Sequence, residues 1–127
     1  MDEPKVLYQD STLTAQDDMD MVYLTDLPEG VHIVASGFIR LGRVTTIPKG
    51  AVIIAGKDLD LRNVKTISEN AILVAGENLY LDNLKRVSGG VTFISRGHMH
   101  MQSLATMNDG ITIRAWLDNH TDTRACG

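Results

Sequence analysis

An unbroken 20-residue repeat constrains this chain more than any other feature of its sequence. Apolar residues recur at that spacing without any insertion, at Leu7, Leu27, Ile47, Ile67, Val87 and Met107. This gives about five full repeats and half of a sixth. A unit this short cannot bury its own apolar side chains, so it has to stack on its neighbours. We therefore expect an N-terminal tail at residues 1–6, a repeat domain at 7–116 and a polar C-terminal tail at 117–127.

Each repeat contains two stretches in which apolar residues alternate with other residues. In the third repeat the first stretch holds Ala51 and Ile53, and the second holds Leu59 and Leu61. Alternation with a period of two places one set of side chains on the inner face of a β-strand. We expect strands near residues 31–35, 51–55, 71–75 and 91–95, and a second set near 38–42, 58–62, 78–82 and 98–102.

Two other positions of the repeat predict corners of the chain. The fourth position holds only residues that tolerate a positive φ angle: Asp10, Gly30, Gly50, Asn70, Gly90 and Gly110. The ninth position is always small: Ala15, Ala35, Ala55, Ala75, Ser95 and Ala115. The pattern leaves no room for a long helix. It predicts an all-β fold, a parallel β-solenoid of about five to six coils, and a right-handed one because parallel crossovers prefer that hand.

Two strings of the repeat carry a resemblance to known proteins. Leu27-Pro28-Glu29-Gly30 and Ala55-Gly56-Lys57-Asp58-Leu59-Asp60-Leu61 resemble the short leucine-rich-like repeats of phage and bacterial proteins, over about residues 7–116. The resemblance implies a phage or bacterial origin and a small rigid binder, which in that setting often inhibits a host or defence protein. The repeat is also similar to bactofilins and to the C-terminal domain of a bacterial cell-division inhibitor. A straight β-helix and a curved leucine-rich shape both stay open, since only Asn63 and Asn83 occupy the asparagine column of a leucine-rich repeat.

Composition and charge exclude several classes of protein. The single cysteine, Cys126, excludes an internal disulfide framework and fits a reducing compartment. No apolar run is long enough to cross a membrane, and the first residues do not form a leader, so we expect a cytoplasmic protein without a membrane partner. Nucleic acid is not favoured as a partner because no basic stripe interleaves with aromatic residues. Charge is uneven: residues 1–26 carry a net −6 and residues 27–106 a net +3.

Outward positions of the first strand set predict an apolar surface. Six such positions, on four successive repeats, hold aliphatic residues: Val34, Val52, Ile54, Ile72, Val74 and Ile94. A monomer rarely leaves such a patch bare, so we predict a homodimer contact or a docking site for another protein. The alternatives are that a tail of the chain covers the patch, or that it reflects the strand preference of aliphatic residues.

A second outward surface combines charged and aromatic residues. It consists of Arg40, Asp60, Tyr80, His98 and His100. Arg40 and Asp60 are one repeat apart and should pair, whereas Tyr80 beside His100 is a candidate recognition spot. Two histidines without a nearby carboxylate or cysteine are a weak metal signal, so we expect no metal or other cofactor.

The sequence contains little that supports catalysis. It has no nucleophile elbow, zinc-protease motif or phosphate-binding loop, although Asp58 and Asp60 could form a carboxylate pair. We therefore expect a non-catalytic protein–protein interaction module. A self-assembling scaffold of stacked solenoids is the alternative, followed by a small enzyme or metal protein. Against stacking, we expect the polar first repeat and a lid formed by Trp116 to close the two ends.

Overall fold

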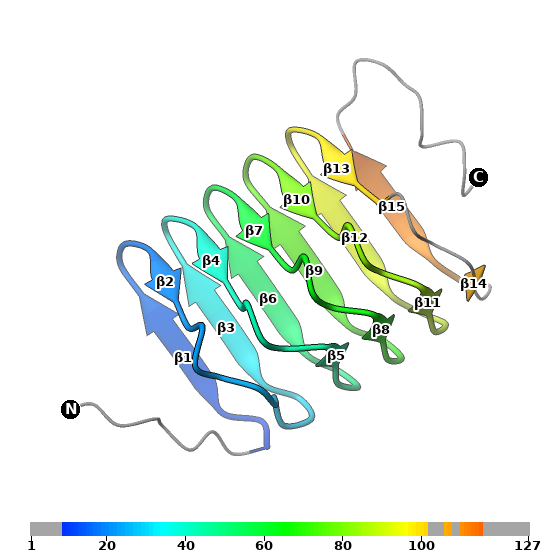
Figure 1. The fold of residues 1–127 in the computed structure, drawn as a ribbon, viewed down its shortest axis with the longest axis horizontal. Coiled ribbons are helices and arrows are strands. Elements are labelled where there is room, and N and C mark those ends of the chain that lie inside the picture. Colours follow the sequence, from blue (N-terminus) through cyan, green and yellow to red (C-terminus); the bar gives the residue numbers. More distant parts are fainter. Residues whose placement is uncertain (1–8, 102–105, 108–109, 116–127) are drawn as a thin grey trace.

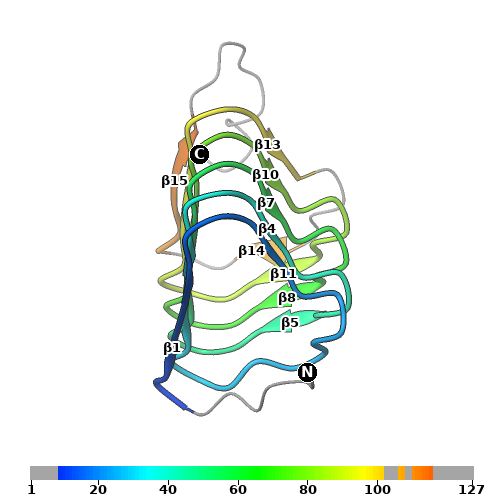
Figure 2. The ribbon, with the colours of Figure 1, turned by 90° about the vertical axis from the view of Figure 1, so that its left-hand side faces the viewer.

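The computed structural model describes residues 9–101, 106–107 and 110–115. This part of the chain is a parallel β-solenoid whose coils stack in a straight row, without any helix (Figure 1). Viewed from the N-terminal end, the chain turns clockwise as it recedes, which makes the solenoid right-handed (Figure 2). The predicted fold class is confirmed, and no described segment is a helix that could cross a membrane. The predicted lid, Trp116, as well as Cys126, lies outside the described residues.

Three parallel sheets form the three sides of the coil. The first sheet contains the four-residue strands β1 (Thr12–Ala15), β3 (His32–Ala35), β6 (Val52–Ala55), β9 (Ile72–Ala75), β12 (Thr92–Ser95) and β15 (Thr112–Ala115). The second contains β2 (Met19–Asp20), β4 (Ile39–Arg40), β7 (Leu59–Asp60), β10 (Leu79–Tyr80) and β13 (Met99–His100). The third contains β5 (Thr46–Ile47), β8 (Thr66–Ile67), β11 (Arg86–Val87) and β14 (Thr106–Met107). Every strand pair is offset by 20 residues, as in Ile53 with Leu73.

The second set of strands is shorter than the sequence predicts. Only two residues of each five-residue stretch form a strand, for example Leu59–Asp60. The reason is a turn directly after the strand, in which the Val64 N–H donates to the Leu61 carbonyl over 3.1 Å. Leu61 still points inward and is fully buried, so the alternation correctly predicts its burial although the strand has ended.

The predicted corners are confirmed by the backbone angles. All six residues of the fourth position have a positive φ, between 60° at Asp10 and 81° at Gly110. Asp10 and Asn70 are the only residues other than glycine with a positive φ in the described part of the chain. This conformation is open to Gly, Asn and Asp and strained for most other residues.

The interior is a continuous aliphatic core. Ile53, Leu59, Leu73 and Leu79, which we expected to be buried, have no exposed surface, and neither has Phe93. Ser95 is the buried polar exception at the small ninth position. Its hydroxyl lies 2.9 Å from the Glu77 carbonyl and 3.1 Å from the His98 carbonyl, so it can donate to either. This hydrogen bond satisfies the hydroxyl inside the core.

Side chains also connect one coil to the next. Asp18, Asp58 and Asn78 each accept, through Oδ1, the backbone N–H of the residue one coil further on, at 2.9–3.0 Å. Asn63 and Asn83 donate to backbone carbonyls of the preceding coil. Asn63 and Asn83 thus form a short ladder of hydrogen bonds, as the asparagines of a leucine-rich repeat do. The described coils nevertheless form a straight β-helix, without the helical outer face of a curved leucine-rich repeat.

Candidate interaction surface

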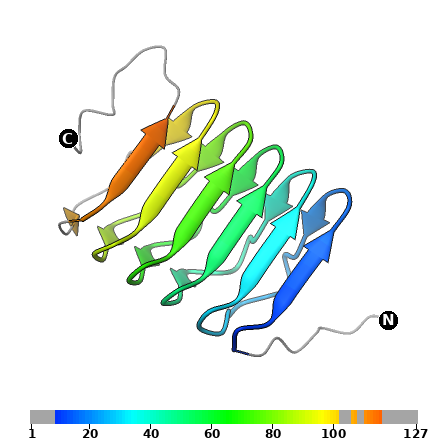
Figure 3. The same ribbon diagram turned by 180° about the vertical axis from the view of Figure 1, so that it is seen from behind.

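The outer face of the first sheet carries the predicted apolar patch. Figure 3 shows this sheet in front, as six long arrows side by side. The six residues of the patch are half-buried or exposed, and Ile72 exposes 36% of its surface. Their chain neighbours Ile33, Ile53, Leu73 and Phe93 point the other way and are fully buried. The structure therefore places all six predicted patch residues together on the outside.

Strand register aligns the patch into rows. Val34, Ile54, Val74 and Ile94 are direct partners on β3, β6, β9 and β12 and form one row. Val52 and Ile72 are direct partners in the neighbouring row. At the usual strand spacing of about 4.8 Å, the four-residue row is roughly 14 Å long between its terminal Cα atoms.

Polarity on this face changes from the centre of the sheet to its edges. The two central strands, β6 and β9, present only aliphatic side chains outward. The next strands each combine one polar and one aliphatic residue, His32 with Val34 on β3 and Thr92 with Ile94 on β12. The edge strands present only polar residues, namely Thr12, Thr14, Thr112 and Arg114. An apolar centre with a polar rim is the usual composition of a protein interface.

The second surface lies on the outside of the second sheet. Arg40 lies between two aspartates, with Nη1 3.1 Å from Asp20 and Nε 3.8 Å from Asp60. The predicted pair of Arg40 and Asp60 therefore exists, although the contact with Asp20 is closer. Asp60 has a second partner in Arg62, whose Nε lies 3.1 Å from its Oδ1.

Aromatic rings continue this surface towards the C-terminal end. Tyr80 and His100 are stacked, with ring centroids 4.8 Å apart and an angle of 17° between the rings. The Arg62 guanidinium carbon lies 4.9 Å from the centroid of the Tyr80 ring. His98 and His100 lie on the same side of the chain, with centroids 6.4 Å apart. Stacking and ion pairing thus occupy the predicted recognition spot with contacts inside the protein.

The two aspartates of the candidate carboxylate pair are each held by contacts within the protein. Asp58 accepts the Asn78 N–H at 3.0 Å, and Asp60 is held by Arg40 and Arg62. Both residues are half-buried. Among the described residues, no group of three or more His, Cys, Asp or Glu side chains is placed to hold a metal ion. We therefore base no catalytic or metal site on these side chains.

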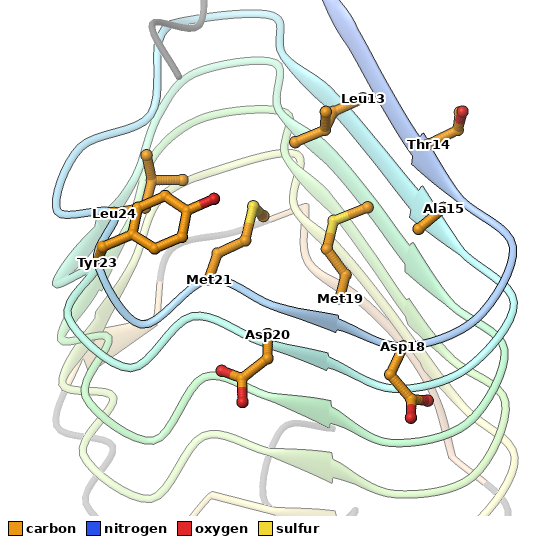
Figure 4. Close-up of a pocket in the computed structure, with 9 residues that line it drawn as sticks. All are labelled: Leu13, Thr14, Ala15, Asp18, Met19, Asp20, Met21, Tyr23 and Leu24. Atoms are coloured by element: carbon orange, nitrogen blue, oxygen red, sulfur yellow. The ribbon is translucent and has the colours of Figure 1, made fainter. Parts of the chain in front are cut away.

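A cavity of about 310 Å³ lies at the N-terminal end of the solenoid. Figure 4 shows Leu13, Met19 and Met21 pointing into it, whereas Asp18 and Asp20 point away. The cavity is the open end of the core, because no described coil precedes the first one. Its lining combines apolar side chains with Thr14, Asp18 and Asp20, which do not form a convergent set of polar groups that would orient a small ligand.

Comparison of the chain with protein-family models, curated proteins and solved structures finds no match. The repeat architecture is therefore established by the structure, and the resemblance to phage and bacterial repeats enters only the proposal below.

Two features of these surfaces were not predicted from the sequence. The Asp18, Asp58 and Asn78 hydrogen bonds belong to one column, in which acid or amide residues recur at multiples of 20 residues. These hydrogen bonds between coils could therefore have been predicted from that recurrence. Arg62 follows Asp60 by two residues, so the alternation of side chains places both on the same face. Their ion pair could have been expected from this spacing.

Proposed function

We propose that this protein is a non-catalytic protein-interaction module that docks a protein on the outer face of its first sheet. The observation that supports this most is the set of six outward aliphatic side chains, aligned over four coils and framed by polar residues. Contiguous apolar surface of this kind is unfavourable in water, and it marks interaction sites on soluble proteins.

The backbone under the patch also suits recognition. Each strand of the patch is hydrogen-bonded on both sides to neighbouring strands, in register. The side chains are valine and isoleucine, which have few rotamers to lose. A partner that docks here therefore meets a surface that is already ordered, which lowers the entropic cost of binding.

The resemblance to phage and bacterial repeats supports a finer form of this proposal. In that form the partner is a host or defence protein in the cytoplasm, and docking inhibits it. This step rests on analogy between repeat types and not on any contact in the molecule.

A scaffold of stacked solenoids is the second candidate, and the open first coil favours it. Leu13 is only partly buried, and β1 has one free edge within the described residues. A free strand edge and uncovered core can pair with another solenoid end. Concentration-dependent fibres in electron micrographs, lost on substitution of Leu13 by Lys, would support this candidate over the first.

The main experiment compares two surfaces of the same protein. Ile54→Asp with Val74→Asp puts two charges in the middle of the apolar patch, and Ile54→Thr with Val74→Thr makes it polar while keeping β-branched residues. Tyr80→Ala with His100→Ala changes the second surface and serves as the control. Each variant is first checked for folding by circular dichroism.

We expect both patch variants to stay folded and to lose association by about 100-fold or more, because buried unpaired polar groups are costly. Association is measured by sedimentation velocity, and by capture of binding proteins from bacterial lysate with the wild type and each variant as separate baits. The control variant should associate like the wild type. Association or capture that is unaffected by the patch variants would refute the proposed function.

A further inference from the structure

We infer that the partner on the apolar face is a second copy of this chain, packed sheet against sheet with the two solenoids antiparallel. This inference rests on the proposed function, because it uses the same face. It adds the identity of the partner, the position of the two-fold axis and the residue pairs that meet across it.

The polarity of the face is symmetric about its centre, midway between β6 and β9. Val52 and Ile54 on one side of this line correspond to Ile72 and Val74 on the other. One strand further out, His32 and Val34 on β3 correspond to Thr92 and Ile94 on β12. At the edges Thr12 and Thr14 correspond to Thr112 and Arg114. Every polar position has a polar counterpart and every apolar position an apolar one.

Such symmetry is what a two-fold interface requires, because the same surface has to fit itself. A two-fold axis that runs along the strand direction, in the plane between the two sheets, places β6 of one copy on β9 of the other. It also places β3 on β12 and β1 on β15. Val34 then meets Ile94 of the second copy, and Thr14 meets Arg114 of the second copy. No polar side chain of the described face is pressed against an aliphatic one.

The alternative two-fold axis, along the solenoid, gives a worse match. It places each strand opposite the same strand of the second copy and reverses the strand direction. Each of the two outward residues of a strand then lies opposite the other one. His32 would meet Val34 of the second copy, and Thr92 would meet Ile94. Burying these polar groups against aliphatic side chains without hydrogen bonds is unfavourable. The composition of β3 and β12 therefore selects the antiparallel arrangement.

The charge distribution selects the same arrangement. Residues 1–26 have a net charge of −6, and the described aspartates among them, at positions 10, 17, 18, 20 and 26, are exposed. Arg96 and Arg114 are exposed near the other end. In the antiparallel dimer the acidic end of each copy lies beside the end of the other that holds Arg96 and Arg114, and residues 87–127 as a whole contain three acids and three bases. In the alternative arrangement the two acidic ends lie side by side and repel each other.

The size of the face indicates a weak to moderate dimer. Six strands at about 4.8 Å, each with four residues at about 3.3 Å, cover a flat area of roughly 29 by 13 Å. This is about half of the ~800 Å² per partner that a standard interface buries. We therefore expect dissociation in the micromolar range, so the test has to be made over a series of concentrations.

Engineered cysteines test which residues meet. In a Cys126→Ser background, Val34→Cys with Ile94→Cys should give a covalent dimer with a short thiol cross-linker of about 5 Å reach, because facing sheets lie about 10 Å apart, which is too far for a direct disulfide. The two cysteines of one chain are about 14 Å apart, by three strand spacings, and point in the same direction, so the same cross-linker cannot join them within the chain. Val34→Cys alone should cross-link at least 10-fold more slowly than the pair. Equal cross-linking in a mixture of the two single variants His32→Cys and Val34→Cys would overturn the antiparallel arrangement, because only the alternative axis places residue 32 of one copy opposite residue 34 of the other.

Charged substitutions at the rim test the antiparallel arrangement independently, without engineered cysteines. Thr14→Glu should tighten the dimer about five-fold, since two exposed ion pairs with Arg114 of the other copy form per dimer. Thr14→Lys should weaken it by a similar factor. Arg114→Glu should reverse the order of the two variants. Association that does not depend on the sign of these charges would contradict the predicted contact.

The outcomes also separate this inference from the proposed function. A wild-type protein that stays monomeric up to the millimolar range, yet captures another protein through Ile54 and Val74, overturns the second-copy inference and leaves the proposed function standing. Association that persists unchanged in Ile54→Thr with Val74→Thr refutes both. A dimer that is lost in this variant, and that cross-links through positions 34 and 94 together, supports both.

Discussion

Ile53 and Ile54 are identical side chains on consecutive residues of β6, and they face opposite environments. Ile53 has no exposed surface, whereas Ile54 is half-buried on the outside of the sheet. The same opposition recurs on the neighbouring coil, where Leu73 is fully buried and Val74 points outward. One residue of register thus separates the core from the proposed interface.

This pair provides the first prediction. Ile53→Ala should lower the free energy of unfolding by about 2–5 kcal/mol, because it leaves a cavity in a closely packed core. Ile54→Ala should lower it by about 1 kcal/mol or less, which reflects strand propensity on a partly exposed face. Urea denaturation followed by circular dichroism measures both. The protein must be dilute, because dimer formation would otherwise add to the apparent stability. Equal losses from the two substitutions would contradict the inward and outward assignment.

A second prediction concerns the corner at the fourth position of the repeat. Gly50 has a φ of 71°, and a Cβ added there would meet nothing closer than 3.8 Å. Gly50→Ala should therefore cost about 1–2 kcal/mol through backbone strain alone. Asn70→Gly, one coil further on, should cost little, because glycine adopts the φ of 61° found there without strain and fits beside Gly90. Thermal unfolding of the three proteins tests this order. An alanine variant as stable as the wild type would show that the corner relaxes.

A third prediction concerns the hydrogen bonds between coils. Asp58 Oδ1 accepts the Asn78 N–H, which lies in a partly buried position. Asp58→Ala removes the acceptor and should lower stability by about 1–3 kcal/mol. Asp58→Asn should retain most of the stability, since Asn78 accepts the His98 N–H in the same way. Hydrogen exchange of the residue 78 amide should become faster in the alanine variant only. Equal exchange in both variants would show that the side chain does not protect this amide.

A fourth prediction concerns the second surface. Tyr80 stacks on His100 and lies near the Arg62 guanidinium, all on an accessible face. Tyr80→Ala should lower stability by about 0.5–1.5 kcal/mol, as the loss of an aromatic pair does. Tyr80→Phe keeps the ring and should stay within about 0.5 kcal/mol of the wild type. Neither variant should change self-association. A loss of association in Tyr80→Ala would indicate that the interaction site lies on this second surface.

Much of the fold could be predicted from the sequence, and the reason is local. Alternation along a strand decides which side chains face inward, so the burial of Ile53, Leu59, Leu73 and Leu79 follows from spacing alone. The conformational preference of Gly, Asn and Asp is also a property of single residues, and it correctly places all six positive φ angles. The 20-residue period then determines that equivalent residues of successive coils become neighbours.

Tertiary structure decided the contacts that depend on the path of the chain between those positions. The sequence did not predict that Asp58 accepts an N–H from the next coil, that Arg62 lies over Tyr80, or that the third side of the coil forms a sheet of its own. It also overestimated the length of the second strands. Periodicity determines which residues share a column, but a hydrogen bond or a stacked ring depends on ångström-scale displacements between coils. Those displacements result from the packing of the whole core and its turns, and no single repeat contains them.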